Sequence, residues 1–425
     1  MKRLLLLQIT IFASLAWPNA CTLSSSMNLS ASGGQWTGTG CTGASYIPGN
    51  GDTATIAANI KLTVDQNWTI GASGASNTTA AIHLLATNNV GAGTLEVKGG
   101  ATLTLRGDLL YDSWTSSGTN IVFNYIVMDA GSGLAFDSSQ ASSPTTTRYR
   151  AGWSGSGGGT YGRGNFDSVG TACATEPTIG CPTHVTVTSV NTNGALNGQF
   201  RGGSNTVGAT VPSQAASIMT AYYTDFSNIG DTTTYGDSIA MGELSGDAGT
   251  VIFSHDTFTN VSAWLCYNTC FTSLQTGDAI TNNLWQNSPQ ALGSPQFGMA
   301  TDSSGSVTIN NNVFDRCIGY AANSVATSFT NNYFGDLQCS SGIGTGNTMY
   351  DNFWRSDQDL GTRNLAGNYS MTGGYVFVDF VQDNPHFINA SSTVSQTWRN
   401  IIYEAPEDVT ADSGVSIQPS PPRPG

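Results

Sequence analysis

Hydrophobic and polar positions alternate along much of this chain with a period of two, over short segments bounded by Gly, Asn and Ser. From about residue 250 onward, the alternation takes one recurring form: an aliphatic or aromatic residue, two positions, Asn or Asp, one position, and then an aromatic residue. The copies are Phe253–Phe258, Ile280–Trp285, Ile309–Phe314, Phe329–Phe334 and Met349–Trp354, followed by a degraded copy at Leu365–Ser370. A period of two predicts β-strands.

The spacing of the copies predicts how these strands are arranged. The ladder residues Asn312, Asn332 and Asn352 are 20 residues apart, and Asp256, Asn283 and Asn312 are separated by 27 and 29 residues. A repeat of this length built from short strands indicates a solenoid whose coils stack into one core. We expect the Asn side chains to stack along the axis at the strand spacing of about 4.8 Å. Such a ladder satisfies backbone groups at a bend, so we assign it a structural role.

These repeats resemble the right-handed parallel β-helix of the pectin-lyase-like superfamily, over roughly residues 216–385. The segments Gly49–Ile56, Ile60–Val64 and Gly93–Leu105 resemble a G8-type domain, a Gly-rich β segment found at the entrance of similar helices. The resemblance implies an all-β fold, a right-handed parallel β-helix. The motifs Asn-Thr-Asp, Gly-His-Gly and Arg-Ile-Lys of enzymes with this fold do not occur, so no catalytic residue is carried over.

Changes in composition divide the chain into five parts. We expect a signal peptide at residues 1–20, G8-like β-helix coils at 21–137 and a Gly-, Arg- and aromatic-rich insertion at 138–215. The main parallel β-helix with its Asn ladder follows at 216–403, and a disordered, Pro-rich tail or linker at 404–425. Four prolines in the last seven residues favour an extended tail.

The first residues predict export. Lys2-Arg3 precedes an apolar run over 4–16, the layout of a secretory signal peptide, with cleavage after Ala20 or after Ala16. Cys21 makes a lipoprotein an alternative, although Pro18 and Asn19 are poor residues for that signal. No later stretch approaches the roughly 18 apolar residues of a spanning helix. We therefore expect a secreted or cell-surface protein, periplasmic or extracellular, with no membrane span.

The eight cysteines support an oxidising compartment. Neighbours in sequence lie 20, 8, 4 and 22 residues apart, which favours four local disulfides among Cys21, Cys41, Cys173, Cys181, Cys266, Cys270, Cys317 and Cys339. A zinc site at Cys266 and Cys270 is the alternative, because some zinc sites use this spacing. No second pair at matching spacing and no nearby His supports it.

Charge excludes one class of function. Of the 425 residues, only 10% are charged and the net charge is -14, so the clustered cations that neutralise phosphates in a nucleic-acid binder are missing. The 51 Gly and the scarcity of Glu, Lys and Arg also argue against a helical fold. An acidic surface repels polyuronates unless Ca²⁺ bridges, which favours a neutral glycan or a Ca²⁺-dependent polyanion.

Two outer columns of the repeats carry candidate chemistry. The position after each ladder Asn gives Leu284, Val313, Tyr333 and Phe353, and the third position gives Gln286, Asp315, Gly335 and Arg355. Tyr333 and Phe353 would form the stacking floor for a sugar, between Asp315 and Arg355 about two strand spacings (~10 Å) apart. Arg316 and Asp336 fall on adjacent coils, as a surface ion pair or as electrophile and general acid. With Asp315 and Arg355 they form the candidate catalytic set. Lyases with this fold use a basic residue to abstract a proton beside a carboxylate, and Ca²⁺ bound by Asp to acidify that proton. The alternative for the whole strip is a loop that packs on it.

A second candidate lies in the expected insertion. Arg148, Tyr149, Trp153, Tyr161 and Arg163 gather cations and aromatic rings around a Gly-rich run. Aromatic faces stack on sugar rings, and Arg forks bind hydroxyls or carboxylates. This segment is either a carbohydrate-contacting loop or a flexible excursion whose aromatics cover the helix.

These observations lead to two hypotheses. The first is a secreted β-helix protein that binds or processes extracellular polysaccharide, as a lyase or hydrolase in the enzymatic case. The second is a non-catalytic, adhesion-type surface protein in which the solenoid acts as a spacer. We expect a monomer with no cofactor, apart from Ca²⁺ in the lyase case. The sequence leaves open whether the protein is an enzyme.

Overall fold

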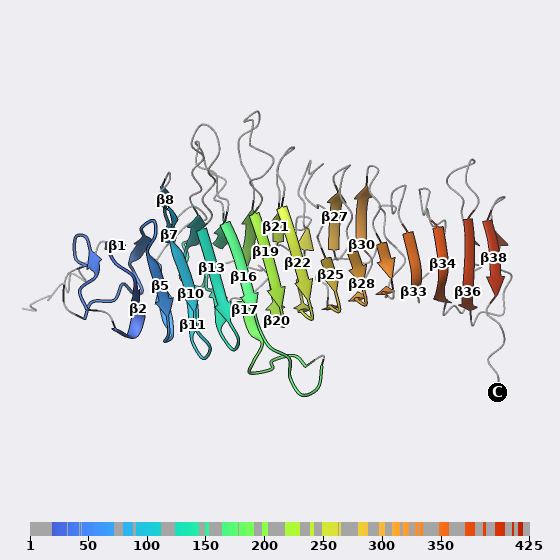
Figure 1. The fold of residues 1–425 in the computed structure, drawn as a ribbon, viewed down its shortest axis with the longest axis horizontal. Helices are drawn as coiled ribbons and strands as arrows, with labels where there is room; N and C mark the ends of the chain where they lie inside the picture. The colour runs from blue at the N-terminus through green and yellow to red at the C-terminus, as the bar shows by residue number, and fades with distance from the viewer. Residues whose placement is uncertain are drawn as a thin grey trace, which may run out of the picture.

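Parallel β-strands stack along one long axis in this protein, as Figure 1 shows. The structure is a computed structural model. It describes residues 19–31, 33–41, 43, 45–71, 80–87, 91–111, 124–143, 149–152, 164–176, 178–190, 198–202, 217–229, 239–241, 249–261, 263–264, 279–287, 297–301, 308–314, 318–322, 328–330, 332–334, 348–356, 370–378, 386–387, 396–403, 410–411 and 415–419.

Successive coils supply strands to three columns, and each strand pairs in parallel with the equivalent strand of the next coil. The first column contains β1 (Ala20–Leu23), β4 (Thr53–Ile56), β7 (Ala80–Leu84), β12 (Asp108–Tyr111), β15 (Tyr149–Gly152), β18 (Gly198–Gly202) and β21 (Ile239–Met241). A separate sheet of β24 (Ala263–Trp264), β27 (Phe297–Thr301) and β30 (Ile318–Ala322) follows along the chain.

The other two columns share the largest sheet. One contains β2 (Met27–Asn28), β5 (Lys61–Val64), β10 (Thr94–Val97), β13 (Asn124–Asp129), β16 (Gly164–Val169), β19 (Ser217–Tyr222), β22 (Gly249–Ser254), β25 (Ala279–Thr281), β28 (Thr308–Asn310) and β31 (Ser328–Thr330). The other contains β6 (Trp68–Ile70), β11 (Thr102–Leu105), β14 (Gly133–Phe136), β17 (Val185–Ser189), β20 (Thr224–Ser227), β23 (Thr257–Thr259), β26 (Leu284–Gln286), β29 (Val313–Phe314) and β32 (Tyr333–Phe334).

The remaining elements extend or decorate this stack. β33 (Thr348–Ser356) pairs with both β31 and β32, and β34 (Ser370–Val378), β36 (Gln396–Tyr403) and β38 (Val415–Pro419) follow it in parallel. Shorter elements are η1 (Leu29–Ala31), β3 (Trp36–Thr37), the antiparallel pair β8 (Ala86–Thr87) and β9 (Gly91–Ala92), and the pair β35 (His386–Phe387) and β37 (Thr410–Ala411). The described fold is all-β with long parallel sheets, an architecture consistent with a β-solenoid.

The core runs along the axis because equivalent positions of the coils are filled by the same class of side chain. The aromatic residues Phe226, Phe258, Trp285 and Phe314 occupy one register position on four successive strands, and all are fully buried. The ring centroids of Phe258 and Trp285 are 3.7 Å apart, with the rings nearly parallel. This stack confirms that the aromatic residue two positions after the ladder residue points inward.

The predicted Asn ladder is present, for the three Asn residues whose side chains the structure describes, at the bend beside this stack. The side-chain oxygen of Asn312 accepts from the backbone N–H of Asn283 at 3.0 Å, and that of Asn332 accepts from the backbone N–H of Asn312 at 3.0 Å. Each amide also donates to a carbonyl of the preceding coil, as Asn312 does to Ile280 at 2.7 Å. All three Asn residues are buried. The ladder therefore pairs backbone groups that the bend leaves without a strand partner.

Asp256 begins the ladder, and its side chain accepts two backbone hydrogen bonds. Its oxygens accept from the backbone N–H groups of Thr224, at 2.8 Å, and Ser254, at 3.1 Å. Burial raises the pKa of Asp256 well above its usual value, and the charge of Asp225 adds to this, while the two backbone hydrogen bonds oppose it. The oxygen that accepts from Thr224 takes the place that the side-chain oxygens of Asn312 and Asn332 hold on later coils.

Two expected boundaries differ from the observed topology. Residues 138–215, expected as an insertion, supply β15 to β18, and β16 pairs in parallel with β13 on one side and β19 on the other. The described stack therefore continues through this segment, because its strands keep the register of their neighbours despite long connections. In the expected tail, β38 pairs in parallel with β36 instead of leaving the stack.

Candidate functional site

The outer column predicted as a sugar-binding strip follows a continuous register. Val313 pairs with Leu284 on one side and with Tyr333 on the other, and Tyr333 pairs with Phe353. Val313 is 41% exposed, whereas the next residue, Phe314, is fully buried. The expected alternation between outward and inward positions is therefore confirmed in β29. Tyr333 and Phe353 occupy the register position of an exposed residue.

Of the four predicted catalytic residues, the structure describes only Arg355. The backbone of Arg355 lies in β33 and pairs with Phe377 of β34. Asp315, Arg316 and Asp336 lie outside the described residues. Their roles as general acid, electrophile or Ca²⁺ ligands stay predictions.

One member of the aromatic and cationic group in the expected insertion, Tyr149, does not have the role predicted for it. Tyr149 is 1% exposed and belongs to the hydrophobic core, so its ring does not offer a face to a sugar. Burial, together with the charges of Asp137 and Asp108, raises the pKa of Tyr149 to about 12. The sequence pattern of neighbouring Arg and aromatic residues could not reveal that β15 points this side chain inward. Arg148, Trp153, Tyr161 and Arg163 lie outside the described residues.

Two of the four predicted disulfides are present. Cys21 bonds to Cys41, and Cys173 bonds to Cys181. The first bond contradicts the lipoprotein alternative, because the Cys21 sulfur that would carry the lipid is already used. Cys266, Cys270, Cys317 and Cys339 lie outside the described residues.

An ion-pair network covers the outer face of the N-terminal coils. Glu96 lies between Lys61 and Lys98, with both pairs at 2.9 Å, and Lys98 also contacts Asp129 at 2.8 Å. Partial burial disfavours the Glu96 carboxylate, but the hydrogen bonds from the two lysines and from Thr63 hold its pKa below its usual value. The network uses two of the three lysines of the chain in a structural role.

A polar cluster that the sequence did not predict lies where the loop from 170 to 184 meets the stack. His184 is 1% exposed; its Nδ1 lies 3.2 Å from Asp225 Oδ1, and its Nε2 lies 3.0 Å from Glu176 Oε1. Partial burial favours the neutral form of Glu176, but hydrogen bonds from the Cys173 and Thr178 N–H groups and from His184 hold its pKa below its usual value. The Asp225 carboxylate also accepts from the backbone N–H of Gly180 at 2.8 Å.

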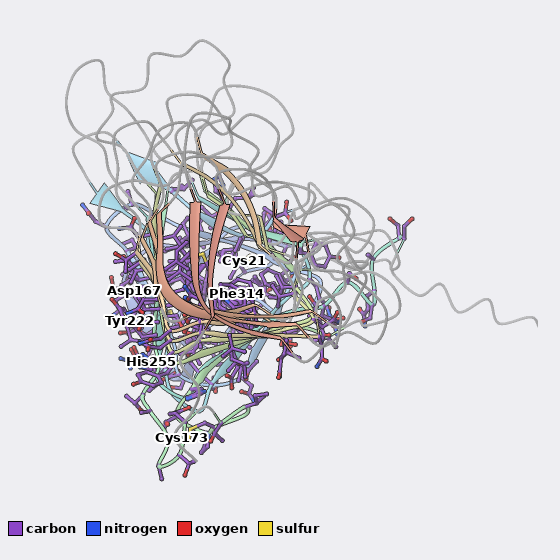
Figure 2. The ribbon with its side chains drawn as sticks, turned by 90° about the vertical axis from the view of Figure 1, so that its right-hand side faces the viewer. Cys21, Asp167, Cys173, Tyr222, His255 and Phe314 are labelled. Carbon is purple, nitrogen blue, oxygen red and sulfur yellow. A yellow bond between two sulfur atoms is a disulfide. The ribbon has the colours of Figure 1, made fainter. Side chains whose placement is uncertain are left out.

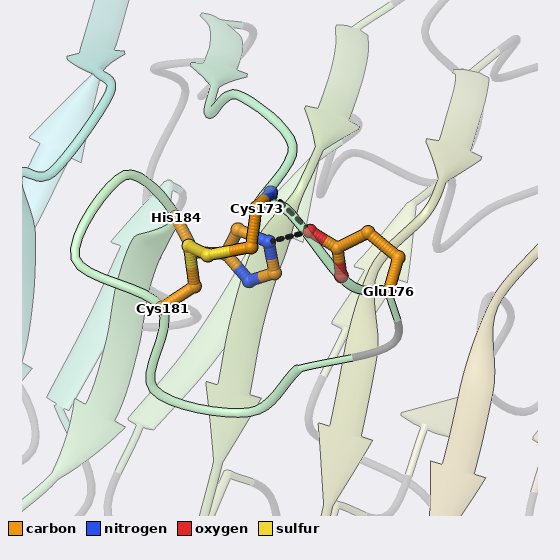
Figure 3. Close-up of side chains that lie close together, drawn as sticks. All are labelled: Cys173, Glu176, Cys181 and His184. Carbon is orange, nitrogen blue, oxygen red and sulfur yellow. Dashed lines mark hydrogen bonds and ion pairs between the residues drawn. A yellow bond between two sulfur atoms is a disulfide. The ribbon is translucent and has the colours of Figure 1, made fainter.

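This cluster stands apart from the predicted strip. Figure 2 shows Cys173 at the outer edge of the molecule, whereas Phe314 lies within the stack. In Figure 3 the Cys173–Cys181 disulfide, Glu176 and His184 face one another at the base of the loop. The sequence shows no partner for His184, because Asp225 is 41 residues away and meets it only through coil stacking. The two flanking cysteines were the one local signal.

Rings continue from His184 along the same bend. The Tyr223 ring lies 5.8 Å from that of His184 and 4.8 Å from that of His255, and the second pair is stacked. Tyr223 and His255 both have positive φ, as do Asn282 and Asn311 on the following coils. Asn and His are both enriched at this backbone conformation, and on these two coils the Tyr223 and His255 rings stack on each other. Figure 2 places His255 on the same side of the stack as Tyr222.

Comparison of the chain with protein-family models and with curated proteins finds no match. Within the described residues, no helix is both long and apolar enough to cross a membrane.

Proposed function

We propose that this protein is an exported, right-handed parallel β-helix of the pectin-lyase-like type that binds an extracellular polysaccharide along its outer strip. The supporting observation is the register of Val313, Tyr333 and Phe353 on three successive parallel strands. Parallel strands lie about 4.8 Å apart, so an extended polymer along the axis meets the same position coil after coil. The two disulfides fit an oxidising, extracellular setting.

Aromatic residues in this strip suit a sugar ligand. The faces of the Tyr333 and Phe353 rings would pack on the C–H faces of sugar rings, with Arg355, two positions after Phe353, donating to hydroxyls or carboxylates. In the enzymatic form of the proposal, Asp315, Arg316 and Asp336 supply acid, electrophile or Ca²⁺ ligands. The net charge of -14 favours a neutral glycan or a polyanion bridged by Ca²⁺.

A binding panel tests the proposal. Acidic and neutral polysaccharides are titrated against the full chain by calorimetry, with and without Ca²⁺, and each variant is checked by circular dichroism. We expect Tyr333→Ala and Phe353→Ala each to weaken binding about tenfold, near 1.4 kcal/mol. Thr308→Ala, at an exposed position of β28, is the matched control and should bind as the parent does. Binding that survives both aromatic substitutions unchanged would exclude the strip as the site.

Turnover is measured separately from binding. Asp315→Ala and Arg355→Ala should abolish cleavage of a bound glycan while the melting temperature stays nearly unchanged. If both variants cleave as fast as the parent, these residues have no catalytic role.

A non-catalytic spacer or adhesion role is the second candidate, and the continuous length of the parallel stack favours it (Figure 1). A rod of stacked coils keeps its two ends apart without any ligand. This role predicts that no glycan of the panel binds and that the strip variants behave as the parent in every assay.

A further inference from the structure

Four side chains with metal-binding atoms meet at the base of the loop between β16 and β17. The ligand atoms of Cys173, Glu176, Cys181 and His184 all lie within 4.8 Å of one another. Two thiolates, one imidazole and one carboxylate form a donor set that suits Zn²⁺. Zinc–ligand bonds of about 2.0–2.3 Å place tetrahedral ligands roughly 3.3–3.8 Å apart, so shifts of about 1 Å would complete the site.

His184 is already oriented as a zinc ligand would be. Asp225 lies 3.2 Å from Nδ1, and Nε2 lies 3.0 Å from Glu176, beside the Cys173–Cys181 disulfide (Figure 3). A carboxylate behind the far ring nitrogen is the usual outer partner of a metal-bound imidazole, because it fixes the tautomer and strengthens the ligand. Asp225 is itself held by Gly180 and by Thr257 of the neighbouring coil. The imidazole is therefore positioned by the stack, independently of the disulfide.

Glu176 is positioned in the same way from within the loop. Its carboxylate accepts from the backbone N–H groups of Cys173 and Thr178 as well as contacting His184. Glu176 is exposed and Cys173 is partly exposed, whereas Cys181 and His184 are buried. Solvent thus reaches the cluster from the Glu176 and Cys173 side. An ion and a reductant can approach without opening the stack.

We propose that reduction of the Cys173–Cys181 disulfide converts this cluster into a Zn²⁺ site. A dithiol reductant supplies two electrons and two protons, the S–S bond breaks into two thiols, and the reductant leaves as its own disulfide. Zn²⁺ then displaces three protons to solvent, one from each thiol and the Nε2 proton that His184 donates to Glu176 in the oxidised loop. It binds the two thiolates, Nε2 of His184 and a carboxylate oxygen of Glu176. A disulfide offers no thiolate, so the oxidised loop and the zinc-bound loop exclude each other.

Cobalt binding tests the donor set. The full-length protein is reduced with a phosphine and titrated with Co²⁺, whose thiolate charge-transfer absorption reports sulfur ligands. We expect this band in the parent, its loss in the double variant Cys173→Ser/Cys181→Ser, and at least tenfold weaker binding in Glu176→Gln. The matched controls Cys21→Ser/Cys41→Ser and Cys266→Ser/Cys270→Ser should keep the band. A reduced parent without the band, or a band that survives loss of Cys173 and Cys181, overturns the proposal.

A second measurement needs no substitution and so does not depend on whether the variants fold. The reduced parent is labelled with iodoacetamide with and without Zn²⁺, and labelling at each cysteine is followed by peptide mass spectrometry. Zinc should slow labelling of Cys173 and Cys181 at least tenfold while leaving Cys21 and Cys41 unchanged. Equal labelling of Cys173 and Cys181 with and without Zn²⁺ overturns the proposal. Neither result depends on glycan binding, because the proposed glycan site is the outer strip at Tyr333 and Phe353 and shares no residue with this cluster.

Discussion

Removing the amide of Asn312 tests how much the ladder contributes to stability. In Asn312→Ala, the backbone N–H of Asn283 loses an acceptor at 3.0 Å, and the carbonyl of Ile280 loses a donor at 2.7 Å. Asn332 keeps the bond from the Asn312 backbone. A buried polar group left unpaired costs about 1–3 kcal/mol, so two such groups predict a loss of roughly 2–6 kcal/mol.

The neighbouring Asn311→Gly variant is the matched control for this prediction. Asn311 is exposed, has a φ of 57° that Gly adopts freely, and loses a single exposed bond to Asn282. We expect its unfolding free energy to stay within about 0.5 kcal/mol of the parent. Urea unfolding followed by circular dichroism measures both variants. If Asn312→Ala costs no more than Asn311→Gly, the ladder does not stabilise the bend in the way argued above.

Three further outcomes are expected. The native state holds the Asp256 proton more tightly than the unfolded chain does, because burial raises the native pKa. The contribution of Asp256 to stability is therefore present at low pH and is lost as pH rises from about 4 through the raised native pKa. Asp256→Asn should flatten that part of the pH–stability curve, and an unchanged slope would contradict the raised pKa. Trp285→Ala should cost about 3–5 kcal/mol in urea unfolding, and Trp285→Phe far less because the ring stack on Phe258 is kept; equal losses would show that stacking is unimportant. Asn19→Ala removes the 2.9 Å bond that the Asn19 amide donates to Asp52, and should cost about 0.5–1.5 kcal/mol in urea unfolding; no loss would show that this bond does not stabilise the fold.

Local pattern predicted the features that repeat from coil to coil. Alternation around Asn283 and Asn312 predicted which neighbours point inward, because a strand places successive side chains on opposite faces. Asn312 and Asn332 stand at the same place in successive copies of the motif, which predicted that their amides meet, because equivalent positions of stacked coils lie next to each other. The pairing of Cys173 with Cys181 was likewise a matter of proximity along the chain.

Contacts outside the recurring motif were not predictable in this way. Asn283 meets Asn312 over 29 residues and could be predicted because both stand at the same place in the motif. His184 meets Asp225 over 41 residues, and His184 has no place in that motif. Composition alone made the segment around Tyr149 look like an insertion, yet its strands pair with both neighbours and bury that ring.

By itself, then, the sequence determined the all-β architecture, the ladder and the inward aromatic stack, since each depends on a period that one coil already contains. The tertiary structure decided the environment of Tyr149 and the meeting of Glu176, His184 and Asp225 beside a disulfide. Those contacts depend on the register between whole coils and on the path of the loop that joins β16 to β17. Register is a property of the stack, which no single coil encodes.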